Sequence, residues 1–133
     1  MATLTDKQIA FLQQPFYAVA TTLRADGSPH STVVWQDVRD GVLFINTAEG
    51  RAKPRHLEGD PRISLTVVDP EDGYRWIAVD GDAELTTEGG DADIDWLAKK
   101  YMGVDEYPWR VEGQVRVTAR ITPRHVTAYG LDD

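Results

Sequence analysis

Gln114-Val115-Arg116-Val117-Thr118-Ala119-Arg120-Ile121 is the stretch that indicates the fold class of this chain most clearly. Polar and apolar residues alternate along all of it, and successive side chains of a β-strand point to opposite faces. The stretch therefore predicts a half-buried strand. Its expected inward side chains are Val115, Val117, Ala119 and Ile121, and its expected outward ones are Gln114, Arg116, Thr118 and Arg120.

Further strands are predicted along the chain, separated by turn signals. Asp26-Gly27, Asp40-Gly41 and Asp72-Gly73 each follow or precede a β-branched, apolar run, as in tight hairpins. Gly81, inside one such run, predicts a bulge, a close backbone approach or a weak edge strand. The predicted strands cover residues 16–23, 30–36, 42–45, 62–69, 74–87, 114–121 and 125–129.

Three short helices are predicted between these strands. Thr5 and Gln8 form a capping box for the first helix, and two others cover residues 50–57 and 89–102. The last one carries apolar residues at helical spacing, namely Ile94, Leu97, Ala98 and Tyr101. So few helices cannot cover both faces of a parallel sheet. The sequence therefore predicts a mainly β (α+β) fold: an antiparallel barrel of six or seven strands, in one domain over residues 1–133.

Composition narrows the class of protein. The chain has 133 residues, a formal net charge of −8 and no cysteine, which excludes disulfides and thiolate chemistry. No apolar run approaches the roughly 18 residues that span a bilayer, and no apolar segment follows residues 1–6 as a signal peptide requires. We expect a cytoplasmic protein with no membrane segment. The negative charge also argues against a nucleic-acid partner.

A cluster of positive charge interrupts this acidic chain. Arg51, Lys53 and Arg55 have no acidic residue among them, and they lie at the start of the predicted helix 50–57. Free N–H groups and the helix dipole favour an anion at such a position. Asn46 and Thr47, at the end of the preceding strand, can add side-chain donors. The pattern is typical of a phosphate site, with a solvated basic turn as the alternative.

Two tryptophans are predicted on outward strand faces. Alternation within residues 74–87 places Trp76 among carboxylates, and Trp35 shares a face with Val33 and Asp37. We expect an outward-facing indole ring to be buried by another molecule, either a ring-shaped ligand or a second subunit. An ordinary half-buried tryptophan is the alternative for each. We therefore expect a homodimer.

The sequence shows no acid, base or nucleophile arranged for catalysis. His30, His56 and His125 lie far apart in the chain without the spacing of metal ligands. The acidic residues between 88 and 95 suit a solvated helix start. We assign no catalytic and no metal-binding residue, and we expect a bound cofactor to supply the chemistry.

The order of these motifs resembles a known family. Ala20-Thr21-Thr22-Leu23-Arg24-Ala25-Asp26-Gly27-Ser28-Pro29-His30, Arg51-Ala52-Lys53 and Tyr74-Arg75-Trp76 occur as in the pyridoxamine 5'-phosphate oxidase-like split β-barrel family. The likeness extends through nearly the whole chain, and it is closest to the actinobacterial branch that uses the deazaflavin coenzyme F420. The resemblance implies a split β-barrel that forms homodimers, with cofactor sites at the subunit interface.

The resemblance also implies roles for particular residues. In such proteins a basic pair after the third strand holds the cofactor phosphate, which corresponds here to Arg51 and Lys53. Main-chain groups of the second strand line the ring, and these positions are Thr32, Val33, Val34 and Trp35. Three strand-end positions lie beside the phosphate, namely Ile45, Asn46 and Thr47. Trp76 would lie near the pocket, from its own or the partner subunit.

Two departures from the family's oxidases bear on the cofactor. The chain stops short of the C-terminal segment with which true pyridoxamine phosphate oxidases grip vitamin B6. Its basic motif reads Arg51-Ala52-Lys53, where the flavin oxidases usually have adjacent Arg and Lys. The resemblance thus implies an F420-dependent reductase that passes a hydride to a conjugated organic substrate. An FMN-dependent oxidoreductase and a cofactor-binding protein without turnover are the alternatives.

Overall fold

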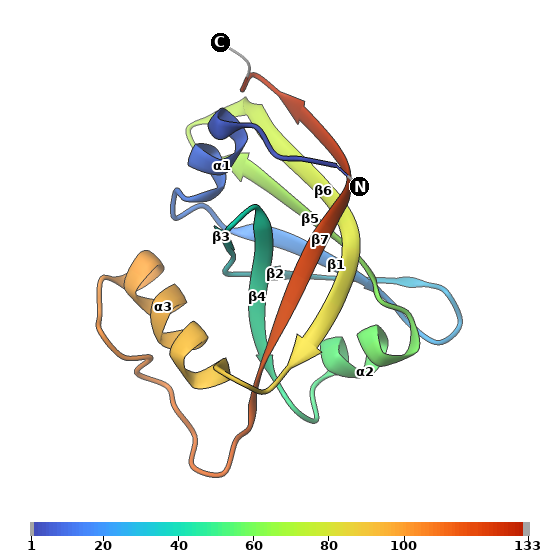
Figure 1. Cartoon of the computed structure of the whole chain (residues 1–133), viewed down its shortest axis with the longest axis vertical. Helices are drawn as coiled ribbons and strands as arrows, with labels where there is room; N and C mark the ends of the chain where they lie inside the picture. The colour runs from blue at the N-terminus through green and yellow to red at the C-terminus, as the bar shows by residue number, and fades with distance from the viewer. Residues whose placement is uncertain (1, 132–133) are drawn as a thin grey trace.

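A computed structural model describes residues 2–131, so residues 1, 132 and 133 of the predicted domain lie outside it. Its centre is one antiparallel sheet in the order β2-β1-β5-β6-β7-β4-β3, which coils into a barrel (Figure 1). The strands are β1 (Ala18–Leu23), β2 (Pro29–Val34), β3 (Asp37–Arg39), β4 (Val42–Ala48), β5 (Arg62–Asp69), β6 (Asp72–Thr86) and β7 (Arg116–Tyr129). The prediction of a mainly β, antiparallel fold with six or seven strands is confirmed, although β3 was not predicted and β7 combines the two strands predicted over residues 114–121 and 125–129.

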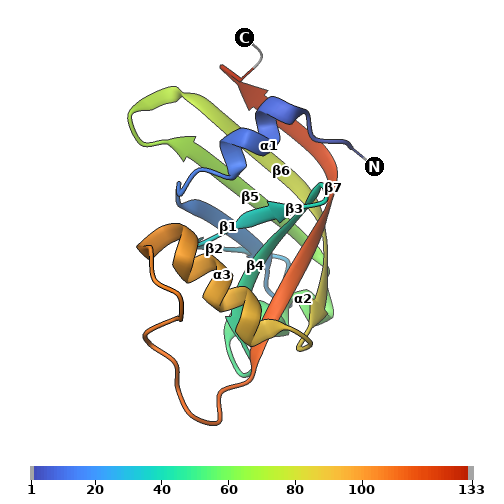
Figure 2. The ribbon, with the colours of Figure 1, turned by 60° about the vertical axis from the view of Figure 1, so that its left-hand side comes forward.

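Three helices accompany the barrel: α1 (Asp6–Leu12), α2 (Ala52–Gly59) and α3 (Gly90–Met102). The capping box of α1 is present, since Gln8 N–H donates to Thr5 Oγ1 at 3.1 Å and Thr5 N–H donates to Gln8 Oε1 at 2.9 Å. Figures 1 and 2 show α1 and α2 toward opposite ends of the barrel, with α3 lying outside β4 and β7. Of the described helices, none is long and apolar enough to cross a membrane.

The barrel is filled by apolar side chains from its inward strand faces. Side chains with at most 1% exposure include Leu43, Ile45, Leu65, Ile77, Val79 and Ile121. Burial of a side chain of this size stabilises the fold by about 1.5–3 kcal/mol each. The faces predicted for the strand over residues 74–87 are confirmed, because Ile77 and Val79 are buried while Trp76 and Asp80 lie on the other face.

The predicted strand 114–121 differs from the observed β7 in length and in its faces. β7 runs without interruption to Tyr129, and Val115 precedes it with an exposed side chain. Arg116 and Thr118, expected outside, are buried, with exposures of 6% and 0%. The reason is α3, which packs on the outer face of this half of β7 and buries both sides of it. An alternating pattern of polar and apolar residues identifies a solvent-exposed strand face only when no other element packs on that face.

Gly81 lies where two strands come unusually close. The register between β6 and β7 shifts between Asp80 and Gly81, and a Cβ added to Gly81 would stand 2.2 Å from the carbonyl oxygen of Thr122. The predicted bulge and close approach are therefore both present. The alternative of a weak edge strand is wrong, because β6 is paired on both sides.

Candidate functional site

One cleft in the structure gathers most of the residues predicted for the cofactor. It lies between the ends of β2 and β4, the start of α2, the inner side of α3 and the loop after α3, and it has a volume of about 270 Å³. We call it the β2–α3 cleft. Its lining residues are Tyr17, Val33, Val34, Trp35, Asn46, Thr47, Arg51, Lys53, Ile94, Leu97, Tyr107, Trp109 and Arg116.

Three cations line this cleft, and none of them pairs with a carboxylate of residues 2–131. Lys53 Nζ donates to Thr32 Oγ1 at 2.9 Å. Arg116 Nε donates to Asn46 Oδ1 at 2.9 Å. The side chain of Arg51 makes no hydrogen bond to another residue within 2–131. Cations held together without a counter-ion are an unfavourable arrangement that a bound anion relieves.

The pKa shifts of these groups have the same cause. Burial, and then the charge of Arg51, lowers the pKa of Lys53. Burial and Arg51 also lower the pKa of Arg116. An anion between these side chains would reverse both effects, because it favours the charged form of each group.

A buried hydroxyl points to the same conclusion. Thr47 is 1% exposed, and its Oγ1 has no hydrogen-bond partner within residues 2–131. Beside it, Asn46 Nδ2 donates to the carbonyl oxygen of Gly90 at 2.9 Å, which orients the amide. Buried polar groups are nearly always hydrogen-bonded, and a ligand acceptor in the cleft would complete the bonding of Thr47. The donor set fits a phosphate.

Another part of the cleft wall is aromatic, and the guanidinium carbon of Arg116 lies over its Tyr107 ring, 5.2 Å from the centroid. The ring of Trp35 stacks on Tyr101, with centroids 5.3 Å apart and an interplanar angle of 9°. Tyr17 stacks on the same Tyr101 at 5.7 Å, and Tyr107 meets Trp35 edge-on at 6.2 Å. Trp109 is 60% exposed at the mouth. Such a wall can accept a flat conjugated ring on its exposed surfaces.

A buried polar network fixes this wall. Tyr101 Oη donates to the carbonyl oxygen of Phe16 at 2.7 Å, and burial raises the pKa of Tyr101 to about 12, so the hydroxyl keeps its proton. Next to it, Lys100 Nζ donates to the carbonyl oxygens of Leu12 and Gln36 at 2.7 and 2.6 Å. Lys100 also pairs with Asp37. These bonds hold the chain directly after Trp35, at Gln36 and Asp37, and tie it to the segment 12–16.

The structure places the predicted site residues in three groups. Val33, Val34, Trp35, Asn46, Thr47, Arg51 and Lys53 line the cleft. Thr32 does not line it but bonds Lys53, and Ile45 is fully buried in the barrel core beneath it. Trp76 lies in β6, paired with Val68 and Tyr129, outside the cleft of this single chain.

Other residues of the cleft were not named individually from the sequence, although the resemblance implied that loops such as residues 69–74 and 102–109 shape the substrate side of the pocket. Ile94 and Leu97 were expected only as the inner face of a helix, and Arg116 was expected in solvent. Tyr107 and Trp109 come from the irregular segment between α3 and β7, where no periodicity indicates position. The aromatic content of that segment is the one signal that could have marked them.

Three further expectations are corrected. Asp93 is buried, accepting from Thr118 Oγ1 at 2.7 Å and from Arg39 at 2.8 Å, so it is not a solvated helix-start residue. Asp37 is also buried, because the chain turns between β2 and β3 and removes it from the face of Trp35. The helix α2 starts later than predicted, and Arg51 N–H is not free, since it donates to the carbonyl oxygen of Ala48 at 3.3 Å.

The histidines are also arranged differently from the expectation. The rings of His30 and His56 are in edge-to-face contact, with centroids 5.1 Å apart. Within residues 2–131, however, no three His, Asp or Glu side chains gather as a metal site would require. The distance between two residues in the chain is thus a poor guide here, because β2 and α2 approach each other in the fold.

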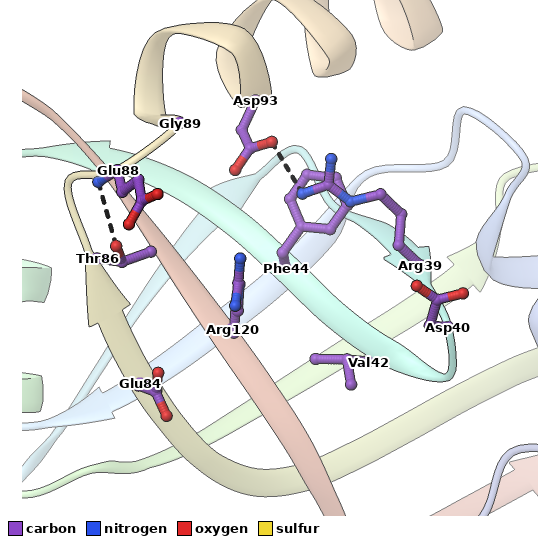
Figure 3. A pocket seen from close by; sticks show the side chains of 10 residues that line it. All are labelled: Arg39, Asp40, Val42, Phe44, Glu84, Thr86, Glu88, Gly89, Asp93 and Arg120. Atoms are coloured by element: carbon purple, nitrogen blue, oxygen red, sulfur yellow. Dashed lines mark hydrogen bonds and ion pairs between the residues drawn. The ribbon is translucent and has the colours of Figure 1, made fainter.

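A larger depression, of about 770 Å³, lies on the outside of the barrel below the start of α3 (Figure 3). Figure 3 shows Arg39 reaching toward Asp93 across the ring of Phe44, with the guanidinium carbon 4.0 Å from the ring centroid. Arg120 stands between this pair and Glu84. The depression is lined by two cations, Arg39 and Arg120, and by four carboxylates, so its charge does not suit an anion, and it contains no predicted site residue. The β2–α3 cleft is therefore the candidate site.

Comparison with known proteins defines the class to which this barrel and cleft belong. The sequence model of the pyridoxamine 5'-phosphate oxidase family matches residues 4–129. The chain belongs to this family, as its resemblance implied.

Particular relatives are close enough to be informative. An F420H(2)-dependent biliverdin reductase of Mycobacterium tuberculosis is 31% identical over 119 residues, which are 86% of this chain and 84% of the relative. A solved structure described as an F420 reductase has a TM-score of 0.83 and 25% identity, and the match covers 93% of this chain and 98% of the other. General stress protein 26 of Bacillus anthracis shares the fold, with a TM-score of 0.69, 21% identity and coverage of 96% and 94%.

Proposed function

We propose that the protein is an F420-dependent reductase that acts on a flat, conjugated organic molecule. The observation that carries the proposal is the β2–α3 cleft. It combines three cations that have no carboxylate partner among residues 2–131, a buried Thr47 hydroxyl without a partner among the same residues, and an aromatic lining. The two relatives named above as F420 enzymes support the choice of cofactor.

The residues of the cleft would divide the binding between them. Arg51 and Lys53 would hold the phosphate of the cofactor, with Thr47 as a further donor and Arg116 as a nearby cation. Main-chain groups of residues 32–35 would lie along the ring. Charge-assisted hydrogen bonds contribute about 1.5–3 kcal/mol each, enough to fix the cofactor in one orientation.

The protein would act mainly by positioning the cofactor and the substrate, and its side chains would supply no reactive group. When bound, reduced F420 supplies a hydride for an electron-poor double bond. The ring of Trp35, supported from behind by Tyr101, would orient the substrate and exclude water from one side of it. Tyr101 retains its own proton and is already bonded to the backbone, so we expect the compensating proton to come from water.

The proposal is tested with protein made in a host that lacks F420. Titration with F420, followed by its fluorescence, is expected to show saturable binding at micromolar concentration or below. Oxidation of reduced F420 should then depend on the acceptor in a panel of biliverdin, quinones and enones. Biliverdin comes first because the Mycobacterium tuberculosis relative is named for its reduction.

The alternative outcomes are distinct. Yellow protein that carries FMN from such a host, with no saturable binding of F420, would assign the FMN-dependent function. Tight F420 binding without turnover of any acceptor would assign a binding protein. Absence of binding to either cofactor would reject the proposal.

We also propose that two copies of the chain form the working unit. The outer face of the sheet carries a diagonal apolar row across five strands. Val33 pairs with Val19, whose partner in β5 is Thr66, and two residues further along β5 Val68 pairs with Trp76, which pairs with Tyr129. Val33 and Tyr129 are 68% and 58% exposed in the single chain. A second copy packed on this row about a twofold axis would bring Trp76 of the partner subunit toward Val33 at the cleft.

The size of the cleft supports this arrangement. A volume of about 270 Å³ is small for a phosphorylated tricyclic cofactor, since ligand pockets usually measure about 300–1,000 Å³. The open side of the cleft is bordered by Val33 and Tyr17, both of which are mostly exposed. A partner subunit on that side would enlarge and close the site.

Replacing Val19 and Val68 by aspartate should convert the dimer to a monomer. Two carboxylates buried in an apolar interface should raise the dimer dissociation constant by about a hundredfold or more. Analytical ultracentrifugation over a range of concentrations measures this shift. Val111→Asp/Val115→Asp is the matched control, because both residues are exposed but lie outside the row. A wild-type chain that sediments as a monomer at micromolar concentration would contradict the proposal.

A further inference from the structure

A second cleft lies on the other side of α2, between that helix and the β1–β2 hairpin. It has a volume of about 850 Å³ and shares no lining residue with the β2–α3 cleft. Its polar lining consists of Arg24 and His30 from the hairpin, Arg55 and His56 from α2, and Asp60. We call it the histidine cleft.

The two histidines are placed there by the strand register. Thr22 of β1 is paired with His30 of β2, so both side chains point to the same face, toward α2. Thr22 Oγ1 and His56 Nδ1 are 2.8 Å apart and share a hydrogen bond, which fixes the ring of His56 and leaves its Nε2 for a ligand. The Nδ1 atom of His30 is buried without a partner among residues 2–131.

The charges around these rings are predominantly positive. Arg24 Nη1 donates to the carbonyl oxygen of Pro29 at 2.7 Å, and Arg55 Nη1 donates to that of Gly50 at 3.0 Å. Neither guanidinium pairs with a carboxylate within residues 2–131. Lys53 adds to the positive potential at His56 from the same helix.

The two carboxylates near the histidine cleft, Asp60 and Asp26, are bonded to residues that do not belong to the proposed site. Asp60 is held by Arg62, with the closest pair of atoms 2.7 Å apart. Asp26, in the hairpin loop, accepts from Ser28 N–H at 2.9 Å and from Ser28 Oγ at 2.6 Å. Neither is bonded to a histidine or to Arg24 or Arg55.

We propose that the histidine cleft binds an oxyanion, a phosphate or carboxylate group, between Arg24, Arg55 and His56, and that His56 takes up a proton when it binds. Two guanidinium groups whose bonds use only backbone or hydroxyl acceptors retain donors for such a group. An imidazolium beside them would add a third charge-assisted bond. This site is additional to the phosphate position proposed at Arg51 and Lys53.

The direction of the pH dependence follows from the surroundings of His56. Burial first, and then His30, Arg24, Arg55 and Lys53, lower the pKa of His56. The imidazole is therefore neutral near pH 7 in the free protein. A bound oxyanion favours the charged form and raises this pKa. Affinity for the anion should rise as the pH falls from the pKa of His56 in the bound state to its pKa in the free state, and should level off below that.

Sulfate is a suitable probe, because it stays doubly charged over the range in which histidine titrates. The ring signals of His30 and His56 are followed by NMR in the full-length protein, with chloride at equal ionic strength as reference. We expect sulfate to raise the pKa of His56 and to bind more tightly at lower pH. Replacing both Arg24 and Arg55 by glutamine should weaken sulfate binding about tenfold or more.

Three variants decide whether the effect belongs to the histidine cleft. Lys99→Gln removes an exposed cation from α3 and should change sulfate binding by less than about twofold. Arg51→Ala/Lys53→Ala should retain the sulfate effect on His56. His56→Gln should bind sulfate without the rise in affinity at low pH. The proposal is overturned if sulfate leaves both histidine signals unchanged, or if the Arg51/Lys53 variant abolishes the effect while the Arg24/Arg55 variant does not.

The same signals identify the source of the oxyanion. F420 added without sulfate would shift the His56 signal if an anionic end of that long molecule reaches the cleft from the Arg51 side of α2. A His56 signal that responds to sulfate but not to F420 assigns a free anion. Both results support the site, and neither depends on whether the protein turns over a substrate.

Discussion

Replacing Arg51 and Lys53 together by alanine is expected to weaken the binding of F420 by about a hundredfold or more, since each charged hydrogen bond contributes about 1.5–3 kcal/mol. The two side chains line the β2–α3 cleft, and neither is neutralised by a carboxylate within residues 2–131, so both charges are available to the phosphate. Fluorescence titration of the wild type and the variant measures the change directly.

A matched variant separates this effect from a general change in charge. Lys99→Ala/Arg124→Ala removes the same two charges from the surface outside the cleft, and its affinity for F420 should stay within about threefold of the wild type. The fold should tolerate both double variants. Lys53 is half-buried with a lowered pKa, so its charge is already poorly solvated and its removal should cost little stability. Equal affinities for the Arg51/Lys53 variant and the wild type would remove the phosphate site from the proposal.

The second large effect concerns stability. Lys100→Met should lower the free energy of unfolding by about 3–5 kcal/mol, because it leaves Asp37 as a buried carboxylate without its cation. The two side chains are 8% and 9% exposed and pair at 3.3 Å. The same substitution removes the donors to the carbonyl oxygens of Leu12 and Gln36. Urea unfolding, followed by circular dichroism, measures the loss.

A double-mutant cycle identifies the cause. Asp37→Asn keeps an acceptor for Trp96 Nε1, which donates to Asp37 at 2.7 Å in the wild type. In Lys100→Met/Asp37→Asn no buried charge remains, so the double variant should be more stable than the sum of the two single losses predicts. Lys99→Met, on the exposed side of α3, should stay within about 0.5 kcal/mol of the wild type. Additive losses would show that the pair is not what holds α3 in place.

The parts of the fold that depend on local pattern could be predicted from the sequence. Thr5 and Gln8 cap α1 as expected, and the predicted strand 62–69 coincides with β5. The predictions that were wrong concern residues whose burial depends on which other element packs on them. Nothing in the alternation of residues 114–121 reveals that α3 covers Arg116 and Thr118, because covering is a property of the tertiary structure.

The candidate site shows the same division. Arg51 and Lys53 could be singled out because their charge contrasts with the rest of the chain, and the structure places both in one cleft with Trp35. His30 and His56 could not be related in this way. Their contact depends on the pairing of β1 with β2 and on the packing of α2 against β1, two long-range features that no short motif encodes.

The segment that connects β6 to β7 and contains α3 begins and ends at neighbouring points of the sheet, because Thr86 of β6 pairs with Thr118 of β7. Residues 87–115 therefore form a cassette whose ends are already closed by the barrel, and the third cation of the cleft, Arg116, stays outside it in β7. The cassette supplies one wall of the β2–α3 cleft through Ile94, Leu97 and Tyr107, whereas the cations Arg51 and Lys53 belong to the barrel's own segments. This cassette could be exchanged between related barrels, provided that Lys100 and its partners Leu12, Gln36 and Asp37 are retained. Such an exchange should change which substrate accepts the hydride, while the residues proposed to bind the cofactor phosphate stay the same.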